Sequence, residues 1–175
     1  NSLGAAFQVL ANLLRGHAAA YRAIHNIQAA ARGGVAHHVR GFEPARPWFP
    51  PDNWMAKVLQ DNFNNAFPGA LVDGRFRFAF RTLPIPETAG AQDFFGLNYY
   101  TSELVAFAPF SKGDFFTKRF FPPGAELSPT GYLASQPEAF FKAMRWATRF
   151  KLPTLITENG VEDSSDLTRP RYLLQ

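Results

Sequence analysis

The sequence has no cysteine among its 175 residues. A disulfide framework and a thiolate metal site are therefore excluded. No apolar run approaches the roughly 18 residues of a membrane-spanning helix, and the N-terminus lacks the basic-then-apolar pattern of a secretory signal. We therefore expect a protein of a reducing compartment, the cytoplasm, with no membrane partner. Because the chain begins at Asn1 rather than Met, we also expect a piece of a longer protein or a processed product.

Phosphate and metal sites also lack their usual residues. Gly33-Gly34 precedes a strand candidate instead of opening a helix, so a glycine-rich phosphate loop is absent. The adjacent His37 and His38 would point to opposite faces of a strand. His17 and His25 lie about two helical turns apart, too far to share an ion on one helix. The sequence therefore predicts neither a metal nor a cofactor.

Charge and aromatic content raise the question of nucleic acid. Net charge is +4, and the chain has 19 Phe, 5 Tyr and 3 Trp. Cations beside aromatic rings suit single-strand binding, and Phe115–Phe121 is the densest example. However, no RNA-binding signature accompanies it. A loop whose aromatic side chains cover a core explains this stretch better, so we expect no nucleic-acid partner.

The hydrophobic pattern predicts alternating helices and strands. Helices are expected at 3–31, at 50–66 up to a break at Pro68-Gly69, near 70–73, from 137 and from about 167. Strands are expected at 35–39, 94–101 and 153–157. Loops are expected at 41–47 and 75–92, and a long functional excursion is expected at 108–136. Such alternation gives a parallel α/β sheet with right-handed crossovers. Three strands cannot close a barrel. The pattern therefore indicates either a small doubly wound sheet or a slice of an α/β barrel, with both edge strands open.

Glu158 stands where the apolar strand of Leu152–Gly160 ends. Working residues of α/β barrels lie at the C-terminal ends of parallel strands, and a carboxylate there can attack an anomeric carbon when a second carboxyl group protonates the leaving oxygen. The Asn159-Gly160 dipeptide predicts a turn that leaves the side chain facing a pocket. A surface glutamate in a turn is equally compatible with this spacing.

Asn98, Tyr99 and Tyr100 end the middle predicted strand. A tyrosine hydroxyl there can donate a hydrogen bond to the carboxylate of the neighbouring strand and hold it in its charged form. Taken alone, however, alternate tyrosines that pack against helices are the better interpretation.

Two segments together identify a family resemblance. Phe95-Gly-Leu-Asn-Tyr-Tyr-Thr101 and Ile156-Thr-Glu-Asn-Gly160 resemble the β-glucosidases of glycoside hydrolase family 1, which are retaining (β/α)8 barrels. The resemblance implies that Glu158 is the nucleophile, that Tyr100 orients it, and that Asn98 binds the sugar. Phe42–Pro47, Asn12–His17 and Asp166–Tyr172 resemble flanking family segments.

The resemblance makes residues 1–175 a single partial barrel domain, from the fourth helix to the start of the seventh, with strands five to seven. The family's Asn-Glu-Pro segment, which carries the acid/base, is absent, as are the sugar-binding Gln and His-Trp of earlier strands and the Trp-rich segment after the eighth. We do not expect Glu43 or Glu103 to replace the missing acid/base, because neither holds its position in the family. His38 stands where many relatives have asparagine near the leaving-group side.

The resemblance therefore implies a retaining β-glucosidase that acts on β-glucosides or oligosaccharides through a glycosyl-enzyme on Glu158. The alternative is a non-catalytic barrel fragment that needs a complementary chain or associates with itself. The sequence leaves open the sugar, the aglycone, the acid/base and the oligomeric state.

Overall fold

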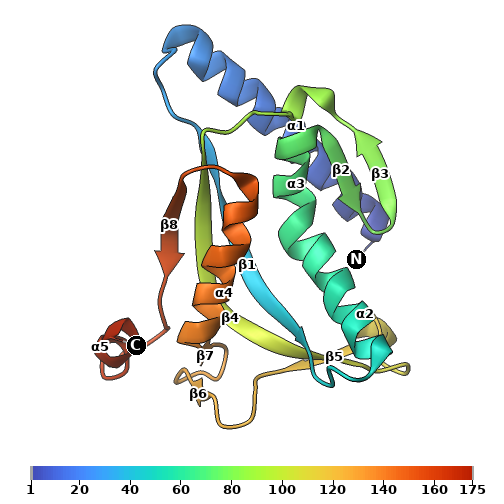
Figure 1. Cartoon of the computed structure of the whole chain (residues 1–175), viewed down its shortest axis with the longest axis vertical. Coiled ribbons are helices and arrows are strands. Elements are labelled where there is room, and N and C mark those ends of the chain that lie inside the picture. Colours follow the sequence, from blue (N-terminus) through green and yellow to red (C-terminus); the bar gives the residue numbers. More distant parts are fainter. Residues whose placement is uncertain (1, 175) are drawn as a thin grey trace.

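A computed structural model describes residues 2–174 of the chain. Its helices are α1 (Leu3–Ile27), α2 (Pro50–Leu59), a π-helical segment (Gln60–Asn65), α3 (Ala66–Asp73), α4 (Pro137–Ala147) and α5 (Arg169–Leu174), with 3-10 turns at Pro86–Thr88, Lys112–Asp114 and Thr148–Phe150. Its strands are β1 (Gly34–Pro44), β2 (Arg75–Phe78), β3 (Arg81–Pro84), β4 (Phe94–Phe107), β5 (Thr117–Phe120), β6 (Glu126–Leu127), β7 (Ala134–Ser135) and β8 (Thr154–Asn159). The predicted alternation of helices with β1, β4 and β8 is confirmed (Figure 1).

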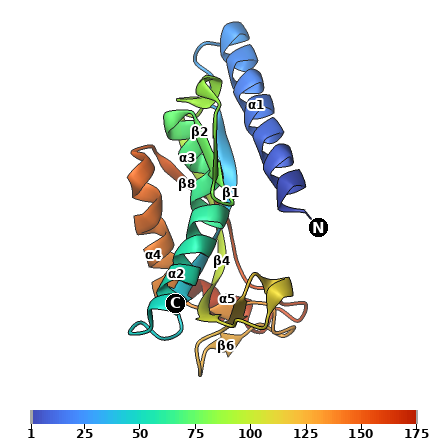
Figure 2. The same ribbon diagram turned by 90° about the vertical axis from the view of Figure 1, so that its right-hand side faces the viewer.

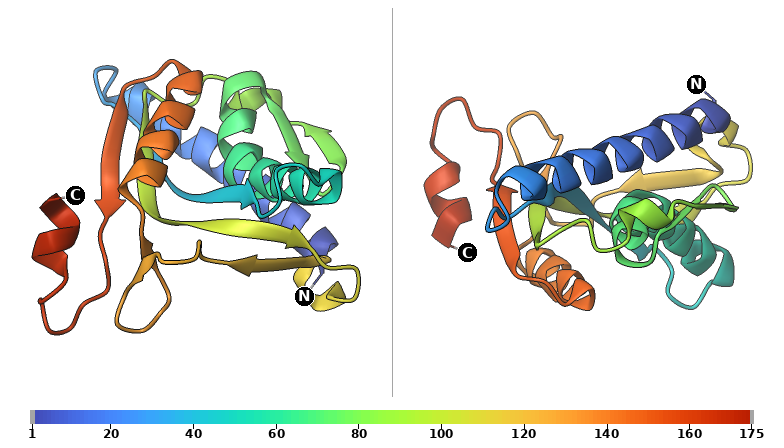
Figure 3. Two further views of the ribbon diagram at one scale, coloured as in Figure 1. Left: turned by 60° about the horizontal axis from the view of Figure 1, so that its bottom comes forward. Right: turned by 90° about the horizontal axis from the view of Figure 1, so that it is seen from above.

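The long strand β4 is the centre of the main sheet. β1 pairs with it in parallel along one edge, from Gly34 opposite Phe94 to Pro44 opposite Val105. The other edge is shared, because β8 pairs in parallel with residues 95–99 and β5 pairs antiparallel with residues 104–107. Figure 3 shows β5 alongside the later part of β4. Within residues 2–174 the outer edges of β1 and β8 pair with no strand, so the sheet is an open slice of a barrel.

Helices α2 and α4 cover one face of this sheet. Phe95, Leu97 and Tyr99 are buried there against Ala143 and Ala147 of α4. Side chains alternate along a strand, so the residues between them point to the opposite face. We call that opposite face, which carries His38, Asn98, Tyr100, Thr157 and Glu158, the inner face.

Helix α1 lies on the other side of the strands from α2 and α4 (Figure 2). Its apolar stripe of Phe7, Ala11 and Leu14 packs against α3 and the β2–β3 hairpin. Polar contacts anchor its second half: the Tyr21 hydroxyl donates to the Asp93 carboxylate at 2.7 Å, just before β4 begins. Helix α1 therefore belongs to the same core as the hairpin. It ends at Ile27, earlier than the predicted residue 31.

The predicted helix break at Pro68-Gly69 is wrong. The chain continues from α2 through the π-helical segment into α3, and Pro68 is the third residue of α3. The backbone is right-handed helical at both Asn65 and Ala66, so Pro68 lies within a continuous helix and does not break it. Helix α3 ends instead at Gly74, whose φ of 70° closes it with a left-handed residue.

The prediction of a loop over 75–92 is also wrong in its first half. β2 and β3 form an antiparallel hairpin in which Arg75 faces Pro84. Its turn residues Ala79 and Phe80 have φ of 50° and 62°, the left-handed pair that a two-residue hairpin turn requires. Because neither is Asn or Gly, the sequence carries no turn signal there. The alternating Arg-Phe-Arg-Phe of β2, with Phe76 fully buried, was the usable signal.

Two strands run further than their patterns predict. β1 continues to Pro44, into the predicted 41–47 loop, and β4 continues to Phe107. The pairing shifts register between Val39 and Gly41, and a Cβ at Gly41 would lie 2.1 Å from the Ser102 Oγ. This glycine therefore marks a close approach of two strands, not a loop. The 108–136 excursion likewise contains paired strands, β5 and the small β6–β7 hairpin.

Within residues 2–174, no helix combines the length and apolar character needed to cross a membrane.

Asp52, in the first turn of α2, ties together the C-terminal ends of β1 and β4. Its side chain is 0% exposed. It accepts hydrogen bonds from Arg46 Nε and Nη2, both at 2.8 Å, and from the Phe107 N–H, also at 2.8 Å. The hydrogen bonds from Arg46 lower the pKa of the Asp52 carboxyl, and the Phe107 amide adds to this effect against its burial.

We expect Asp52→Asn to lower the free energy of unfolding by about 2–3 kcal/mol near pH 7, because it leaves a partly buried guanidinium and amide without an anion. The pKa of Asp52 in the folded state lies below the ordinary Asp value of about 3.9. The stability that its charge provides is therefore fully present above about pH 3.9 and is lost as pH falls from there through the folded pKa. Urea unfolding at about pH 6, 4 and 3 should therefore show the wild-type advantage shrinking with acid. Asp166→Asn, at an exposed ion pair, should cost under about 0.5 kcal/mol. A difference that does not change with pH would contradict this role of Asp52.

Candidate active site

An irregularity in the β4–β8 pairing determines which side chains reach the inner face. Leu97 lies opposite Ile156, but the next residue of β4, Asn98, lies opposite Glu158. Thr157 is therefore one extra residue in β8, a β-bulge, which is rare between parallel strands and is often found beside functional sites. Without it, the strict alternation of β8 would put Thr157 on the inner face and Glu158 on the outer face.

Tyr100 and Glu158 meet on the inner face. The Tyr100 hydroxyl donates a hydrogen bond to Glu158 Oε2 at 2.6 Å. This bond, followed by partial burial, raises the pKa of the Tyr100 phenol, so the hydroxyl keeps its proton and remains a donor to the carboxylate. Glu158 is exposed along with most of β8, which leaves the carboxylate accessible from the inner face.

Asn98 lies directly across from this carboxylate and is only 8% exposed. Its Oδ1 accepts a hydrogen bond from the Thr157 hydroxyl. The bulge therefore has a second effect: the hydroxyl of the extra residue, Thr157, is hydrogen-bonded to the amide oxygen of Asn98. Sequence analysis missed Thr157, and nothing in the spacing of the motif indicates a bulge.

The predicted turn at Asn159-Gly160 is wrong. β8 includes Asn159, and its Nδ2 donates to the Tyr99 carbonyl at 2.8 Å and to the Tyr172 hydroxyl at 2.9 Å. These two bonds hold Asn159 against β4 and against the start of α5. Glu158 is therefore directed by the bulge before it and by the anchored Asn159 after it, rather than by a turn.

The loop that follows β8 is fixed by two carboxylates. Glu162 accepts hydrogen bonds from the hydroxyls of Ser128 and Thr130, in the 108–136 excursion. Asp163 accepts from the backbone N–H groups of Ser165, Thr168 and Arg169, and the Ser165 and Thr168 hydroxyls hold its pKa well below the usual range. The excursion and the loop after Glu158 are thus bonded together.

The four histidines have separate environments. His38 packs edge-on to the Tyr100 ring with 5.8 Å between centroids, and its pKa is lowered by partial burial and by Arg40, which the Glu158 carboxylate opposes. Burial lowers the pKa of His37 to about 4. His17 bonds the Ala91 carbonyl and His25 lies 3.2 Å from Asp93. Between residues 2 and 174, no three His, Cys, Asp or Glu side chains are grouped to hold a metal ion.

The two acidic residues weighed as substitutes for the acid/base have cationic partners. Glu43 lies 2.6 Å from Lys142 of α4, and Glu103 lies 3.5 Å from Arg40 and 3.3 Å from Arg119. Neither has a hydrogen bond or ion pair with Glu158 in the described part of the chain. The inner face therefore offers one arranged carboxylate, Glu158.

Comparison with solved structures decides what this arrangement resembles. A β-glycosidase from Pyrococcus horikoshii superimposes with a TM-score of 0.84 at 30% identity, over 98% of this chain and 39% of that one. A family 1 β-glucosidase from Thermotoga maritima gives a TM-score of 0.82 at 24% identity, over 98% of this chain and 43% of that one, which supports the fold. The chain matches a segment of a family 1 β-glucosidase. The predicted resemblance and the predicted slice of a TIM barrel are confirmed.

Two curated relatives are named β-galactosidases. A β-galactosidase of Sulfolobus acidocaldarius is 24% identical over 93% of this chain and 34% of its own length. A β-galactosidase of Pyrococcus woesei is 26% identical over 97% of this chain and 38% of its own length. No family model matches the chain. The chain therefore spans little more than a third of the curated relatives it matches.

The adjacent tyrosines provide a matched pair of substitutions. Tyr99 is 1% exposed, and its hydroxyl has no hydrogen-bond partner in residues 2–174. Tyr99→Phe should therefore leave the free energy of unfolding unchanged or raise it by up to about 1 kcal/mol, because it removes an unsatisfied buried group. Tyr100→Phe should lower it by no more than about 1 kcal/mol, the value of one hydrogen bond at an exposed carboxylate. Urea unfolding of both variants tests this; a large loss for Tyr100→Phe would place that ring in the core instead.

Proposed function

We propose that this chain carries the nucleophile side of a retaining β-glucosidase site. The observation that supports it best is the 2.6 Å hydrogen bond from Tyr100 to Glu158 on the inner face. The bond leaves Glu158 Oε1 for the substrate, while the Tyr100 hydroxyl fixes the carboxylate's orientation. Relatives named β-glycosidase and β-glucosidase match almost the whole chain, which supports a glycosidic substrate of β configuration.

In this proposal Glu158 attacks C1 of a β-linked glucosyl residue. The bond from carboxylate oxygen to C1 forms as the C1–O bond to the aglycone breaks, and the aglycone oxygen takes the electron pair. In natural substrates that oxygen also needs a proton from a second carboxylic acid, which the rest of the barrel would supply. Water activated by the same acid/base then hydrolyses the glycosyl-enzyme.

Asn98 and Tyr100 have distinct parts in the proposal. Because the Thr157 hydroxyl occupies Asn98 Oδ1, the amide hydrogens of Asn98 remain to donate to a sugar hydroxyl beside the nucleophile. Tyr100 fixes the aim of the Glu158 carboxylate, and its raised pKa keeps it a donor through the neutral range. Neither role requires a metal or a cofactor.

The test isolates the nucleophile from the missing acid. We expect a 2-fluoro-glucoside with a dinitrophenyl leaving group to form a stable covalent adduct, because such a leaving group departs without protonation. Intact mass should rise by one fluoroglucosyl group, and peptide mapping should place it on Glu158. Glu158→Gln should form no adduct, whereas Glu138→Gln, a surface change at the start of α4, should react as the wild type does. Tyr100→Phe should react at least about tenfold more slowly, since one oriented charge-assisted bond is lost.

An adduct that survives Glu158→Gln, or that maps elsewhere, would remove Glu158 from the nucleophile role.

A barrel fragment that associates is the second candidate, and the open sheet favours it. Leu155 and Ile156 of β8 are 50% and 54% exposed, and the free edges of β1 and β8 present unpaired backbone groups, which invite another strand. The chain would then function only with a complementary segment, or as an assembly with itself. Its span from the fourth barrel helix to the seventh is part of this proposal.

For the fragment we expect size-exclusion chromatography with light scattering to show species larger than one chain, increasing with concentration. Ile156→Lys should shift the distribution towards monomer, because it places a charge on the exposed strand. Phe110→Lys, which places the same charge at a 97% exposed apolar side chain of the 108–136 excursion, is the control that should not. A monomer at all concentrations would argue against association.

A further inference from the structure

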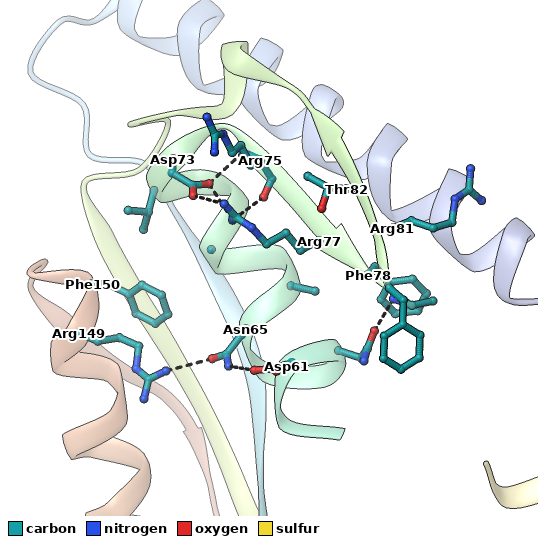
Figure 4. A pocket seen from close by; sticks show the side chains of 16 residues that line it. Asp61, Asn65, Asp73, Arg75, Arg77, Phe78, Arg81, Thr82, Arg149 and Phe150 are labelled. Atoms are coloured by element: carbon teal, nitrogen blue, oxygen red, sulfur yellow. Dashed lines mark hydrogen bonds and ion pairs between the residues drawn. The ribbon is translucent and has the colours of Figure 1, made fainter. Parts of the chain in front are cut away.

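A cavity of about 600 Å³ lies away from the inner face. Figure 4 shows it between α3 with its π-helical extension, the β2–β3 hairpin and the C-terminal end of α4. None of its lining residues belongs to the inner face. Its walls come from elements that are present in this chain, so the strands missing from the barrel are not needed to form it. Its volume falls in the range of small-molecule sites, about 300–1,000 Å³.

The lining of the cavity has more cations than anions. It includes four arginines but only two aspartates, Asp61 and Asp73. Arg77 is compensated, because its Nη2 lies 2.7 Å from Asp73 Oδ2. Arg81 has its guanidinium 4.3 Å above the Phe7 ring, and Figure 4 shows Arg75 and Arg81 pointing away from the centre.

Arg149, like Arg75 and Arg81, has no ion pair in the described part of the chain, and its guanidinium carbon lies 5.2 Å from the centroid of the Trp146 ring. Its Nη1 donates to Asn65 Oδ1 at 3.3 Å and its Nε donates to the Trp146 carbonyl at 3.1 Å, so both partners are neutral. Figure 4 shows it directed towards Asn65, at the lower side of the cavity. Asp61 acts on the charge of Arg149 from a distance, and its Oδ1 accepts a hydrogen bond from Asn65 Nδ2 at 2.9 Å. The cavity therefore has one guanidinium, directed towards its lower side, that no carboxylate contacts directly.

The remaining walls are apolar and aromatic. Phe78 and Phe150 face the cavity, with Ala66 and Val72 between them. Phe80, in the hairpin turn, also lines the cavity and is 85% exposed. The hairpin thus adds a solvent-exposed ring to the lining.

We propose that this cavity binds a small aromatic carboxylate. Arg149 is the arginine of the lining that neither contacts a carboxylate nor points away from the cavity, and a planar guanidinium pairs with a carboxylate through two parallel hydrogen bonds. The ring of the ligand packs between Phe78 and Phe150 while its carboxylate meets Arg149. The site is independent of the Tyr100–Glu158 pair and of the reaction proposed for it.

Calorimetric titration of the full chain with 2-naphthoate tests the proposal. We expect saturable binding of one naphthoate per chain, and binding of the neutral 2-naphthalenemethanol at least about tenfold weaker, because the ionic hydrogen bonds are lost. Arg149→Gln should weaken naphthoate binding by about the same factor. Phe80→Ala should weaken both probes equally, since it removes apolar contact only.

Arg145→Gln is the matched control, because Arg145 lies one turn earlier on α4 and does not line the cavity. It should bind naphthoate as the wild type does, and circular dichroism should show all variants folded. Three outcomes overturn the proposal: no saturable binding of naphthoate, equal binding of the neutral alcohol, or unchanged binding by Arg149→Gln.

Discussion

The backbone pairing of β4 with three neighbours holds the rest of this fold in place. β1 pairs along nearly its whole length, and β8 and β5 share the opposite edge end to end. Every other layer depends on this arrangement, because α4 packs on the odd-numbered side chains of β4 and the inner face carries the even-numbered ones. A slip of one residue in this register would exchange the two sets, placing Asn98 and Tyr100 under α4 and turning the core side chains to the inner face.

Tyr99 and Tyr100 show how this constraint separates packing from chemistry. Tyr99 stacks on Phe140 with 5.4 Å between ring centroids, and burial raises the pKa of its phenol. Tyr100 meets a carboxylate instead. Both interpretations of the tyrosine pair, core packing and a contact with Glu158, therefore hold, one for each residue. Identical side chains one position apart receive different surroundings because a strand alternates its faces.

The alternation of helices with three parallel strands could be predicted because it rests on local features, apolar runs with polar residues at their ends. The contact of Tyr100 with Glu158 is implied by the family resemblance, because spacing alone favours packing of the tyrosines. Three features could not be predicted. The bulge at Thr157 depends on how β8 pairs, which no spacing within β8 records. The β2–β3 hairpin lacks its usual turn residues, since Ala79 and Phe80 occupy the two left-handed positions, and the Ala79 N–H donates a hydrogen bond to Asn62 Oδ1. Pro68 lies inside a helix that continues from the π-helical segment into α3, so the usual helix-breaking signal of proline misleads there.

Glu162 connects the long excursion of residues 108–136 to the loop that follows Glu158. Its carboxylate links Ser128 and Thr130 of the long excursion to the chain four residues beyond Glu158. These hydrogen bonds couple the two segments, so the position of each depends on the other. A change in the excursion can therefore alter the surroundings of Glu158 without altering a residue of the inner face.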